Sequence, residues 1–358
     1  MNRKAVALLS GGLDSMLSVR LILDQGIPVT GLRFVTPFGC ETGSGGSCGR
    51  DVESLARVWA PLGLDVRIIP LGQEYVERVR NPLFGRGRNM NPCVDCRVLM
   101  LQWARLAMER EGAGFLVTGE VLNQRAMSQT RDRLRQIDRA AGVEGLVLRP
   151  LSARRLDPTL PERMGVVDRE RLLDLSGRGR TRQYELAARY GIAEIPQPGG
   201  GCLLTDPEYS ERLRDLWEHD PGAGLRDLEL LKVGRHFRPG PHCKIVVGRD
   251  EEENRVIEAL ETSGDALLFL RDYEGPTVLV RGAYGPEDLR LAASLAVRYG
   301  DVPGKAASQV VVRRQGEYAK IVAEGAREEV YAPLRVGVKA QATRGKRGMP
   351  QPGGWRRP

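Results

Sequence analysis

A glycine-rich hexapeptide near the N-terminus, SGGLDS at positions 10–15, constrains the fold of this chain more than any other feature. The apolar run Ala5–Leu9 precedes it, and the amphipathic stretch Ser15–Gln25 follows it. A strand that ends at a glycine pair and leads directly into a helix is the ligand-binding junction of a doubly wound sheet. The glycines let backbone N–H groups approach a phosphate, and the helix N-terminus adds donors and partial positive charge. We therefore expect a phosphate site that comprises Ser10, Gly11, Gly12, Asp14 and Ser15.

Within this loop, Ser10 and Ser15 supply hydroxyl donors, and the carboxylate of Asp14 can help to hold Mg²⁺. The hexapeptide lacks the lysine of a Walker loop, so it is a different phosphate-binding motif. A plain glycine-rich turn would be the alternative interpretation of a looser pattern.

The first half of the chain alternates between strand and helix patterns, which predicts an α/β fold with a parallel sheet covered on both faces. Expected strands are Ala5–Leu9, Val29–Val35, Asp65–Ile69 and Phe115–Thr118, and expected helices are Ser15–Gln25, Asp51–Leu62, Val94–Glu111, Asp168–Leu175, Thr181–Tyr190 and Asp206–Glu218. Asp206 is the expected N-cap of the last of these helices, with Pro207 at its first position.

The pattern changes after Asp220–Gly224, where several strands surround one expected helix, Pro286–Tyr299. The expected strands are Ile245–Val247, Ala266–Leu270, Thr277–Val280, Ser308–Arg313 and Glu317–Val322. A length of 358 residues gives a prior of two domains, at about 150 residues each. We therefore expect a nucleotide-binding domain at 1–222, a smaller α+β domain at 223–338 and a basic disordered tail at 339–358.

Three cysteines are candidates for reactive or metal-binding chemistry. Cys93 and Cys96, in the segment Asn91–Arg97, lie on the first turn of an expected helix, a location that lowers a thiol pKa. Cys202 follows three glycines, which allow the backbone to fold it against another site. A lone C-x-x-C occurs equally in zinc sites and redox pairs. The remaining thiols, Cys40 and Cys48 in a glycine-rich loop and Cys243, are expected to be free or inert.

Charge is distributed unevenly along the chain. The net charge is +8, of which +7 lies between residues 335 and 358 and +6 between Arg125 and Arg182, so the rest is mildly acidic. Two basic zones on an acidic body indicate a polyanionic partner such as nucleic acid, although a solvated face with a basic tail would have the same composition. No run approaches the ~18 apolar residues of a membrane span, and the N-terminal apolar run is too short for a signal peptide. We expect a cytoplasmic protein with reduced cysteines.

The hexapeptide resembles the pyrophosphate loop (PP-loop) of the ATP pyrophosphatase superfamily, whose members split ATP into AMP and pyrophosphate to adenylate a carbonyl oxygen. Together with Asn91–Cys96 and the Cys202 segment, it is similar to the tRNA thiouridine synthases, over roughly residues 1–222. The resemblance implies an adenine nucleotide alpha-hydrolase-like fold and a tRNA sulfurtransferase that turns uridine into thiouridine. It also implies ATP and Mg²⁺ at the loop, with Gly119 and Arg125 beside the nucleotide.

The same resemblance implies that Cys93, Cys96 and Cys202 are the catalytic thiols, with Asp14 as the catalytic carboxylate. In the family, such cysteines either hold a [4Fe–4S] cluster with one open iron position or carry sulfur as a persulfide; structural zinc is a third alternative. Of the three, the cluster is favoured because three thiolates with one vacant position make a reactive site. The sulfur donor is expected to be sulfide or a persulfide carrier protein.

After residue 222 the chain resembles the small RNA-binding module of ribosome-quality-control proteins, notably at Lys244–Asn254. We expect it to depart from the 4-thiouridine synthases, because these 358 residues show no N-terminal extension of the kind that guides those enzymes to tRNA and no rhodanese-like module. The resemblance implies that tRNA is held by the C-terminal domain and tail. An added structural domain remains the alternative.

Two other functions remain open at this stage. One is an ATP pyrophosphatase that acts on a small molecule, such as a zinc-binding 7-cyano-7-deazaguanine synthase. The other is a non-catalytic RNA-binding protein with a vestigial nucleotide fold. The modified uridine and the oligomeric state do not follow from the residues.

Overall fold

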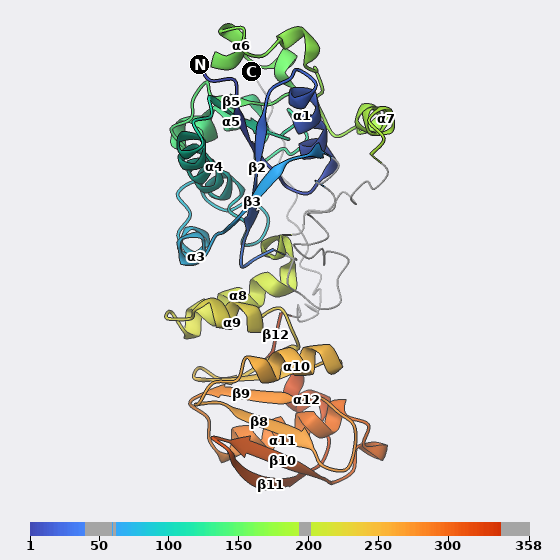
Figure 1. Cartoon of the computed structure of the whole chain (residues 1–358). Coiled ribbons are helices and arrows are strands. Elements are labelled where there is room, and N and C mark those ends of the chain that lie inside the picture. The colour runs from blue at the N-terminus through green and yellow to red at the C-terminus, as the bar shows by residue number, and fades with distance from the viewer. Residues whose placement is uncertain (40–58, 60–61, 193–201, 338–358) are drawn as a thin grey trace, which may run out of the picture.

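The computed structural model describes residues 1–39, 59, 62–192 and 202–337, and its first part contains a five-stranded parallel sheet (Figure 1). The strand order is β3-β2-β1-β4-β5, and every neighbouring pair is parallel. The strands are β1 (Ala5–Leu8), β2 (Val29–Val35), β3 (Asp65–Pro70), β4 (Phe115–Thr118) and β5 (Val147–Leu148). The order reverses between β1 and β4, and in open α/β sheets ligands bind at such a switch point. The predicted doubly wound fold is confirmed.

Helices cover both faces of this sheet because its central strands are apolar on both sides. Ala5 and Ala7 of β1 belong to a core with α1 (Leu13–Leu23), whereas Val6 and Leu8 belong to a core with α3 (Gln73–Arg80) and α4 (Cys93–Arg110). All four residues of β1 are buried. The remaining helices of this part are α5 (Arg131–Ala140), α6 (Leu160–Arg163) and α7 (Thr181–Arg189).

The expected elements agree with the structure at most places, with one clear error. Asp168–Leu175 is not a helix: Asp168 caps a short 3-10 turn, Arg169–Arg171, and the chain then runs extended. Its backbone pairs with the segment after β5, with Leu173 N donating to Pro150 O and Leu175 N to Leu151 O. Most of the expected helix 51–62 lies outside the described residues, as do Cys40, Cys48, Gly199–Gly201 and the tail from 339.

Two helices, α8 (Pro207–His219) and α9 (Leu225–Leu230), lie between the two sheets (Figure 1). Asp206 caps α8 as expected, its side chain accepting a bond of 2.7 Å from Tyr209 N. One face of α8 contributes Tyr209 and Leu213 to the core shared with the first sheet. On its other side, Asp215 pairs with Arg238 of the second sheet at 2.7 Å. The boundary at 222 remains a prediction, since α8 and α9 contact both parts.

The C-terminal part is a seven-stranded antiparallel sheet with the order β11-β10-β8-β9-β7-β6-β12. Helix α11 (Pro286–Tyr299) packs on one face and α10 (Glu251–Ala259) on part of the other. The strands are β6 (Arg235–Gly240), β7 (Cys243–Val247), β8 (Ala266–Leu270), β9 (Val278–Gly282), β10 (Ser308–Arg314), β11 (Glu317–Ala323) and β12 (Arg335–Val336), and a short helix α12 (Glu328–Tyr331) precedes the last strand. The expected smaller α+β domain is confirmed.

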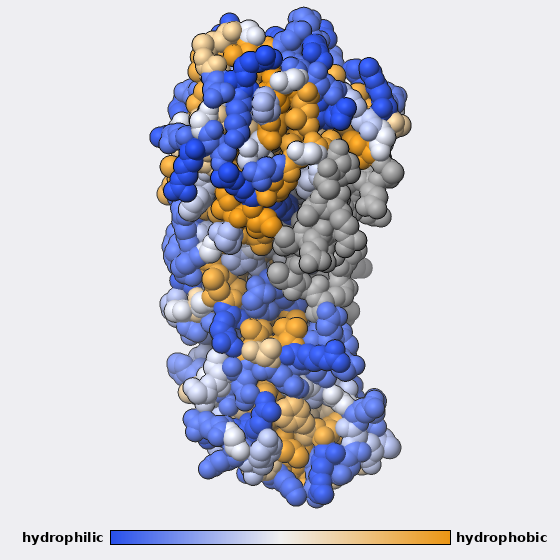
Figure 2. Space-filling view, viewed as in Figure 1, coloured by the Kyte–Doolittle hydropathy of each residue, from blue (hydrophilic) through white to orange (hydrophobic). Residues whose placement is uncertain are grey.

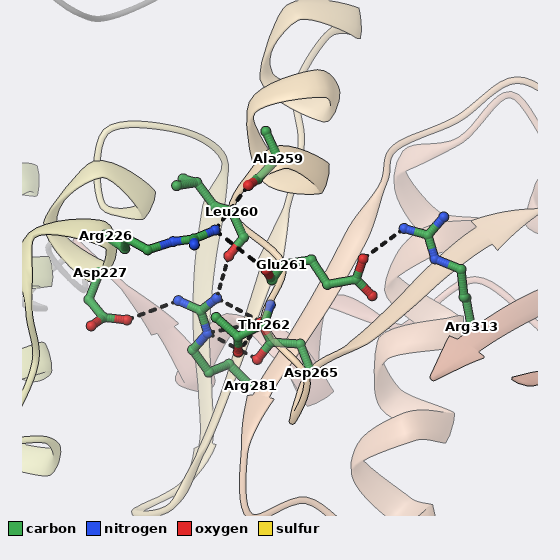
Figure 3. Close-up of polar contacts among 9 residues, drawn as sticks. All are labelled: Arg226, Asp227, Ala259, Leu260, Glu261, Thr262, Asp265, Arg281 and Arg313. Carbon is green, nitrogen blue, oxygen red and sulfur yellow. Dashed lines mark hydrogen bonds and ion pairs between the residues drawn. The ribbon is translucent and has the colours of Figure 1, made fainter. Parts of the chain in front are cut away.

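Arg281 ties α9 to this second sheet (Figure 3). Its guanidinium lies 2.7 Å from Asp265 and 2.9 Å from Asp227 of α9, and it donates to Leu260 O at 2.8 Å. In the described part of the chain, no helix is both long and apolar enough to cross a membrane.

Candidate active site

The loop between β1 and α1 has the geometry of a phosphate cradle. Gly11 adopts a positive φ of 71°, which favours glycine, and Gly12 is the N-cap of α1. The two serines brace the loop: Ser15 Oγ donates to Gly12 O at 2.7 Å, and Ser10 Oγ accepts from Gly12 N at 3.3 Å. The two hydroxyls lie 3.2 Å apart. The sequence SGGLDS thus forms the helix-start loop that was expected.

Asp14, in the first turn of α1, is held with one oxygen unpaired. Its Oδ2 accepts from Gln124 at 3.1 Å and lies 3.3 Å from the guanidinium of Arg180. Its Oδ1 is buried and has no hydrogen-bond partner. A buried carboxylate oxygen needs a partner, and a Mg²⁺ ion would supply one. The expected role of Asp14 toward Mg²⁺ therefore fits this site.

Gly119 lets the end of β4 touch this loop. A Cβ at position 119 would lie 2.5 Å from Ser15 N and 2.8 Å from Asp14 C, closer than side-chain atoms approach a backbone. Only a glycine fits there without displacing the loop. The contribution of Gly119, a predicted site residue, is that it lets the end of β4 lie against the backbone of Asp14 and Ser15.

All three candidate thiols line the cavity into which the loop opens. Cys93 and Cys96 lie on the first turn of α4, and Cys202 precedes a 3-10 turn that pairs with the segment of Phe38. The cavity has a volume of about 290 Å³. Its lining includes the expected site residues Ser10, Gly12, Asp14, Cys93, Cys96, Gly119, Arg125 and Cys202. Sequence positions as distant as 10 and 202 therefore meet in one cavity.

The expectation that the helix N-terminus lowers the thiol pKa values is wrong. Burial raises the pKa of Cys93 and Cys96, and it raises the pKa of Cys202 to about 12. Arg125 acts in the opposite direction on Cys93 and Cys202, but it does not outweigh the loss of solvent. Desolvation, which disfavours the charged form of a thiol, is the largest cause of the raised pKa at all three cysteines. In the metal-free chain these cysteines are therefore neutral at pH 7.

Tyr75 of α3 is a site residue that the sequence analysis missed. Its hydroxyl donates to Cys96 Sγ at 3.2 Å, and its ring packs against Phe38 with centroids 5.8 Å apart. The side chain is almost fully buried, and burial raises the pKa of the phenol well above its ordinary value. Nothing in the local sequence relates α3 to α4, so only tertiary structure brings this donor to the thiol.

Positive charge exceeds negative charge on the cavity wall. Four arginines line it, against two carboxylates, Asp14 and Glu120; the arginines are Arg33, Arg97, Arg125 and Arg180. Arg33 lies in β2 and donates to Leu9 O at 3.3 Å. A charged residue inside a mostly apolar strand was a usable signal that the sequence analysis did not take up. This excess suits a polyphosphate ligand.

Glu120, on the cavity wall, is held by two arginines. Its carboxylate lies 2.9 Å from Arg149 Nε and 3.2 Å from Arg97 Nε, and only 2% of its side chain is exposed. Burial alone would raise the pKa of Glu120, but Arg97 and Arg149 outweigh burial and lower it. Arg149 in turn forms two bonds to Asp138, at 2.7 and 2.8 Å. Arg97 is therefore held at the first turn of α4, next to Cys96.

The three thiols suit a metal group by their chemical type, and they line one cavity. Three sulfur donors line one cavity, and none is paired with another in a disulfide. Within the described ranges, no three His, Cys, Asp or Glu side chains lie close enough together to form a ligand set. A single bound ion would therefore have to draw the three thiols together.

A larger cavity, of about 410 Å³, lies beside α5 and β5 and contains none of the expected site residues. Several of its arginines are paired: Arg135 with Asp157 at 2.6 Å, and Arg149 with Asp138. Because these arginines are already paired with carboxylates of the same cavity, little unpaired positive charge remains there to bind an anionic ligand.

Two family models match the chain. The model described as thiamine biosynthesis protein (ThiI) matches residues 1–155, and the model described as NFACT protein RNA binding domain matches residues 234–331. The first match contains the loop, Cys93 and Cys96, and the second contains β6 to β11. The first family model thus covers the parallel sheet, and the second covers most of the antiparallel sheet.

Curated relatives with similar sequences are named tRNA-specific 2-thiouridylase MnmA. The protein of Rhizobium leguminosarum bv. trifolii (strain WSM2304) is 30% identical over 320 residues, which cover 79% of this chain and 75% of that protein. The protein of Nitratidesulfovibrio vulgaris (strain DSM 19637 / Miyazaki F) is 28% identical over 248 residues, 65% of each chain. The chain thus spans slightly less than two thirds of the length of this second relative, and 61% of that from Heliobacterium modesticaldum (strain ATCC 51547 / Ice1).

Among solved structures, the U34-tRNA thiolase NcsA from Methanococcus maripaludis with its [4Fe-4S] cluster overlaps 65% of this chain and 71% of its own. The TM-score is 0.31 at 17% identity. An overlap at this level supports no statement about the chemistry of the present site.

Proposed function

The chain belongs to the tRNA thiouridylases of the PP-loop type, and from this membership we propose that it replaces a carbonyl oxygen of a tRNA uridine with sulfur. One observation carries the proposal: the pyrophosphate loop and Cys93, Cys96 and Cys202 line the same cavity. A phosphate cradle next to three thiols is what an enzyme needs to activate an oxygen and then replace it with sulfur.

The first half-reaction is adenylation of the uridine. ATP binds with its phosphates at Ser10–Ser15, where Gly12 and the N-terminus of α1 present donors. The uridine carbonyl oxygen attacks the α-phosphorus, and pyrophosphate leaves with the electrons of the broken P–O bond. Asp14 would hold the Mg²⁺ that accompanies the phosphates, and Arg33 and Arg180 are placed to neutralise charge on the departing pyrophosphate.

The second half-reaction is substitution by sulfide. A sulfide sulfur attacks the adenylated carbon, and AMP leaves with the electron pair of the C–O bond, so no net oxidation or reduction occurs. Cys93, Cys96 and Cys202 would hold a [4Fe–4S] cluster, which when bound supplies an iron with an open coordination position. Tyr75 donates to the thiol of Cys96, and the pairing of Arg97 with Glu120 holds the helix turn beside that thiol.

The C-terminal domain is proposed to hold the tRNA, since its family model is described as RNA-binding. An enzyme that acts on a small molecule needs no such domain, and the relatives named above modify tRNA. The 7-cyano-7-deazaguanine alternative and the non-catalytic alternative are therefore not favoured.

The proposal is tested with cysteine variants and thionucleoside analysis. Purified chain, reconstituted with iron and sulfide, is incubated with ATP, sulfide and unmodified tRNA, and the digested tRNA is analysed by mass spectrometry. We expect Cys93→Ala and Cys202→Ala each to reduce thiouridine formation by about 100-fold or more, as for removal of a group that is used only in the reaction. ATP–pyrophosphate exchange with tRNA should persist in both variants.

Cys243→Ala is the matched control, because Cys243 is a buried thiol of the second sheet, away from the cavity. Its thiouridine yield should equal that of the wild type. Wild-type yield from Cys93→Ala or Cys202→Ala would contradict the proposed thiol chemistry. Absence of exchange in every form would contradict adenylation.

A further inference from the structure

The antiparallel register of the C-terminal sheet creates a face of mixed aromatic and basic residues. We propose that this face, here called the open sheet face, binds an unpaired stretch of RNA. The inference rests on the proposed function, in which tRNA is the substrate, and it specifies which surface of the domain takes the RNA. The open sheet face consists of Leu267, Phe269, Arg271, Gln309, Val311, Arg313, Tyr318, Lys320 and Val322.

The pairing of β8, β10 and β11 places these residues in three rows. Directly opposed residues of antiparallel strands point to the same side of a sheet. Val311 of β10 is opposite both Phe269 and Lys320, and this row forms the middle of the face. Arg313 is likewise opposite Leu267 and Tyr318, and Gln309 is opposite Val322. Arg271 completes the third row through its backbone bond to Gln309.

Neither neighbouring helix covers this face completely. Helix α11 packs on the opposite side, against Val310 and Val312. Helix α10 covers the same side only as far as Leu267 and Phe269, through Val256 and Leu260. The β10–β11 end of the sheet is left exposed, with Tyr318 70% and Val322 67% accessible. Figure 2 shows that hydrophobic atoms of this lower domain reach the surface between hydrophilic ones.

The charge of the face fits a polyanion. Its nine positions hold three cations, Arg271, Arg313 and Lys320, and no carboxylate. Two of these cations have acidic partners at the margin of the face, since Arg271 lies 3.6 Å from Asp272 and Arg313 pairs with Glu261. Glu261 at the margin pairs with Arg313 at 2.9 Å (Figure 3). The Arg313 guanidinium lies 5.6 Å from the centre of the Phe269 ring. Lys320 extends from the edge strand with no carboxylate opposite it in the register.

These features are the ones that bind single strands. Bases stack on exposed aromatic rings of a sheet while cations follow the backbone phosphates. Tyr318 supplies an accessible ring, and Val311 and Val322 supply apolar contact. Lys320 lies between Tyr318 and Val322 on β11, and Arg271 lies across β10 from Val322. A protein partner that added a strand to β11 would use backbone groups and would require neither the ring nor the cations. The side-chain chemistry therefore favours RNA.

The test measures binding of fluorescein-labelled oligouridylate and of unmodified tRNA to the full chain at several KCl concentrations. We expect Tyr318→Ala to weaken oligouridylate binding by about 5- to 150-fold, the range for loss of one stacked base. Tyr318→Phe should bind as the wild type does, because stacking needs the ring and not the hydroxyl. Lys320→Ala should reduce the slope of log affinity against log salt by about 0.7, which corresponds to one single-strand phosphate contact.

Arg290→Ala is the matched control, since Arg290 is an exposed cation of α11, on the opposite side of the sheet. Its affinity and salt slope should be unchanged. If Tyr318→Ala and Lys320→Ala both bind RNA with the affinity and the salt slope of the wild type, the open sheet face is not an RNA site. Unchanged RNA binding together with a changed sedimentation coefficient would also overturn it, by assigning the face to self-association.

The experiments distinguish failure of the proposed thiolation activity from failure of the open sheet face as an RNA site. ATP–pyrophosphate exchange and thiouridine formation by the wild type test the cavity, whereas oligouridylate binding requires neither ATP nor the cysteines. Binding that depends on Tyr318 in a chain that never thiolates tRNA would support the face and contradict the enzyme. If the chain thiolates tRNA but its tRNA affinity is unchanged by replacement of Tyr318 and Lys320, the enzyme is supported and the open sheet face is contradicted.

Discussion

Among single residues, Gly119 has the most stringent steric requirement at the active site. It allows β4 to contact the backbone of Ser15, and a Cβ there would overlap that backbone. Because the overlap is with backbone and not with a flexible side chain, the strand or the loop must shift. The shape of the phosphate loop therefore depends on a residue more than 100 positions away.

Replacement of Gly119 by alanine should thus damage the ATP site. We expect Gly119→Ala to lower the free energy of unfolding by about 1–3 kcal/mol, the usual cost of overpacking, and to weaken ATP binding measured by calorimetry. Gly264→Ala is the control, because a Cβ at Gly264, in the turn before β8, meets no atom within 4 Å. Wild-type ATP affinity in Gly119→Ala would show that the loop tolerates displacement.

The thiols show a second effect at the residue scale, in which burial outweighs local backbone electrostatics. Cys93 and Cys96 lie at a helix start, yet loss of solvent raises their pKa values. In the proposed enzyme, the metal group would favour the thiolate, since coordination replaces the proton.

At the scale of elements, two guanidinium groups fasten α9 to the C-terminal part: Arg226 of α9 donates to Ala259 O at 3.1 Å, and Arg281 of β9 pairs with Asp227 of α9. Arg281 joins Asp227 of α9 to Asp265, whose side chain is only 2% exposed (Figure 3). Asp265 also accepts from Thr262 N at 2.8 Å, so it holds the turn before β8 as well. Removal of Arg281 would leave a buried carboxylate without its cation.

Arg281→Ala should therefore be strongly destabilising. We expect a loss of about 3–5 kcal/mol in the free energy of unfolding, measured by urea denaturation followed by circular dichroism. Arg255→Ala, which removes an exposed cation of α10, should change stability by less than about 0.5 kcal/mol. A small effect of Arg281→Ala would mean that water reaches Asp265 and replaces the pair.

At the scale of the whole molecule, the contact between α8 and the second sheet contains a buried amine. Lys244 of β7 lies 3.4 Å from Asp215 of α8, and Arg238 shares that carboxylate at 2.7 Å. Burial lowers the pKa of Lys244 to about 8; the attraction of Asp215 opposes this effect, and Arg238 and Arg212 add to it. The same surroundings lower the pKa of the buried His236 well below its ordinary value.

This amine should make stability depend on pH in a defined direction. The folded pKa of Lys244 is about 8, below the unfolded value of about 10.4. Between these values the unfolded chain binds more protons, so the contribution of Lys244 to stability rises with pH and is lost as pH falls through about 8. We therefore expect the unfolding free energy of the wild type minus that of Lys244→Met to rise as pH increases from about 8 to about 10.

Urea denaturation from pH 7.5 to 10 measures that difference. Lys232→Met, which replaces a lysine paired with Glu229 at 2.6 Å on the neighbouring turn, is the comparison variant. A wild-type minus Lys244→Met difference that stays flat or falls over this window would contradict the assigned direction.

The sequence by itself determined the features that depend on local pattern. The glycine pair between an apolar run and an amphipathic stretch identified β1, the loop and α1, and alternating strand and helix patterns identified the parallel sheet. Asp206 and Pro207 located the start of α8. These features are readable because hydrogen bonding and side-chain periodicity act over a few neighbouring residues.

Tertiary structure alone decided what depends on distant residues. Asp168–Leu175 has a helical pattern, yet it runs mostly extended because it pairs with the backbone after β5. The donor from Tyr75 to Cys96, the fit of Gly119 against Ser15 and the high pKa of Cys202 arise only when separate elements pack together. Desolvation and close packing depend on which segments meet in space, and spacing along the chain does not specify that.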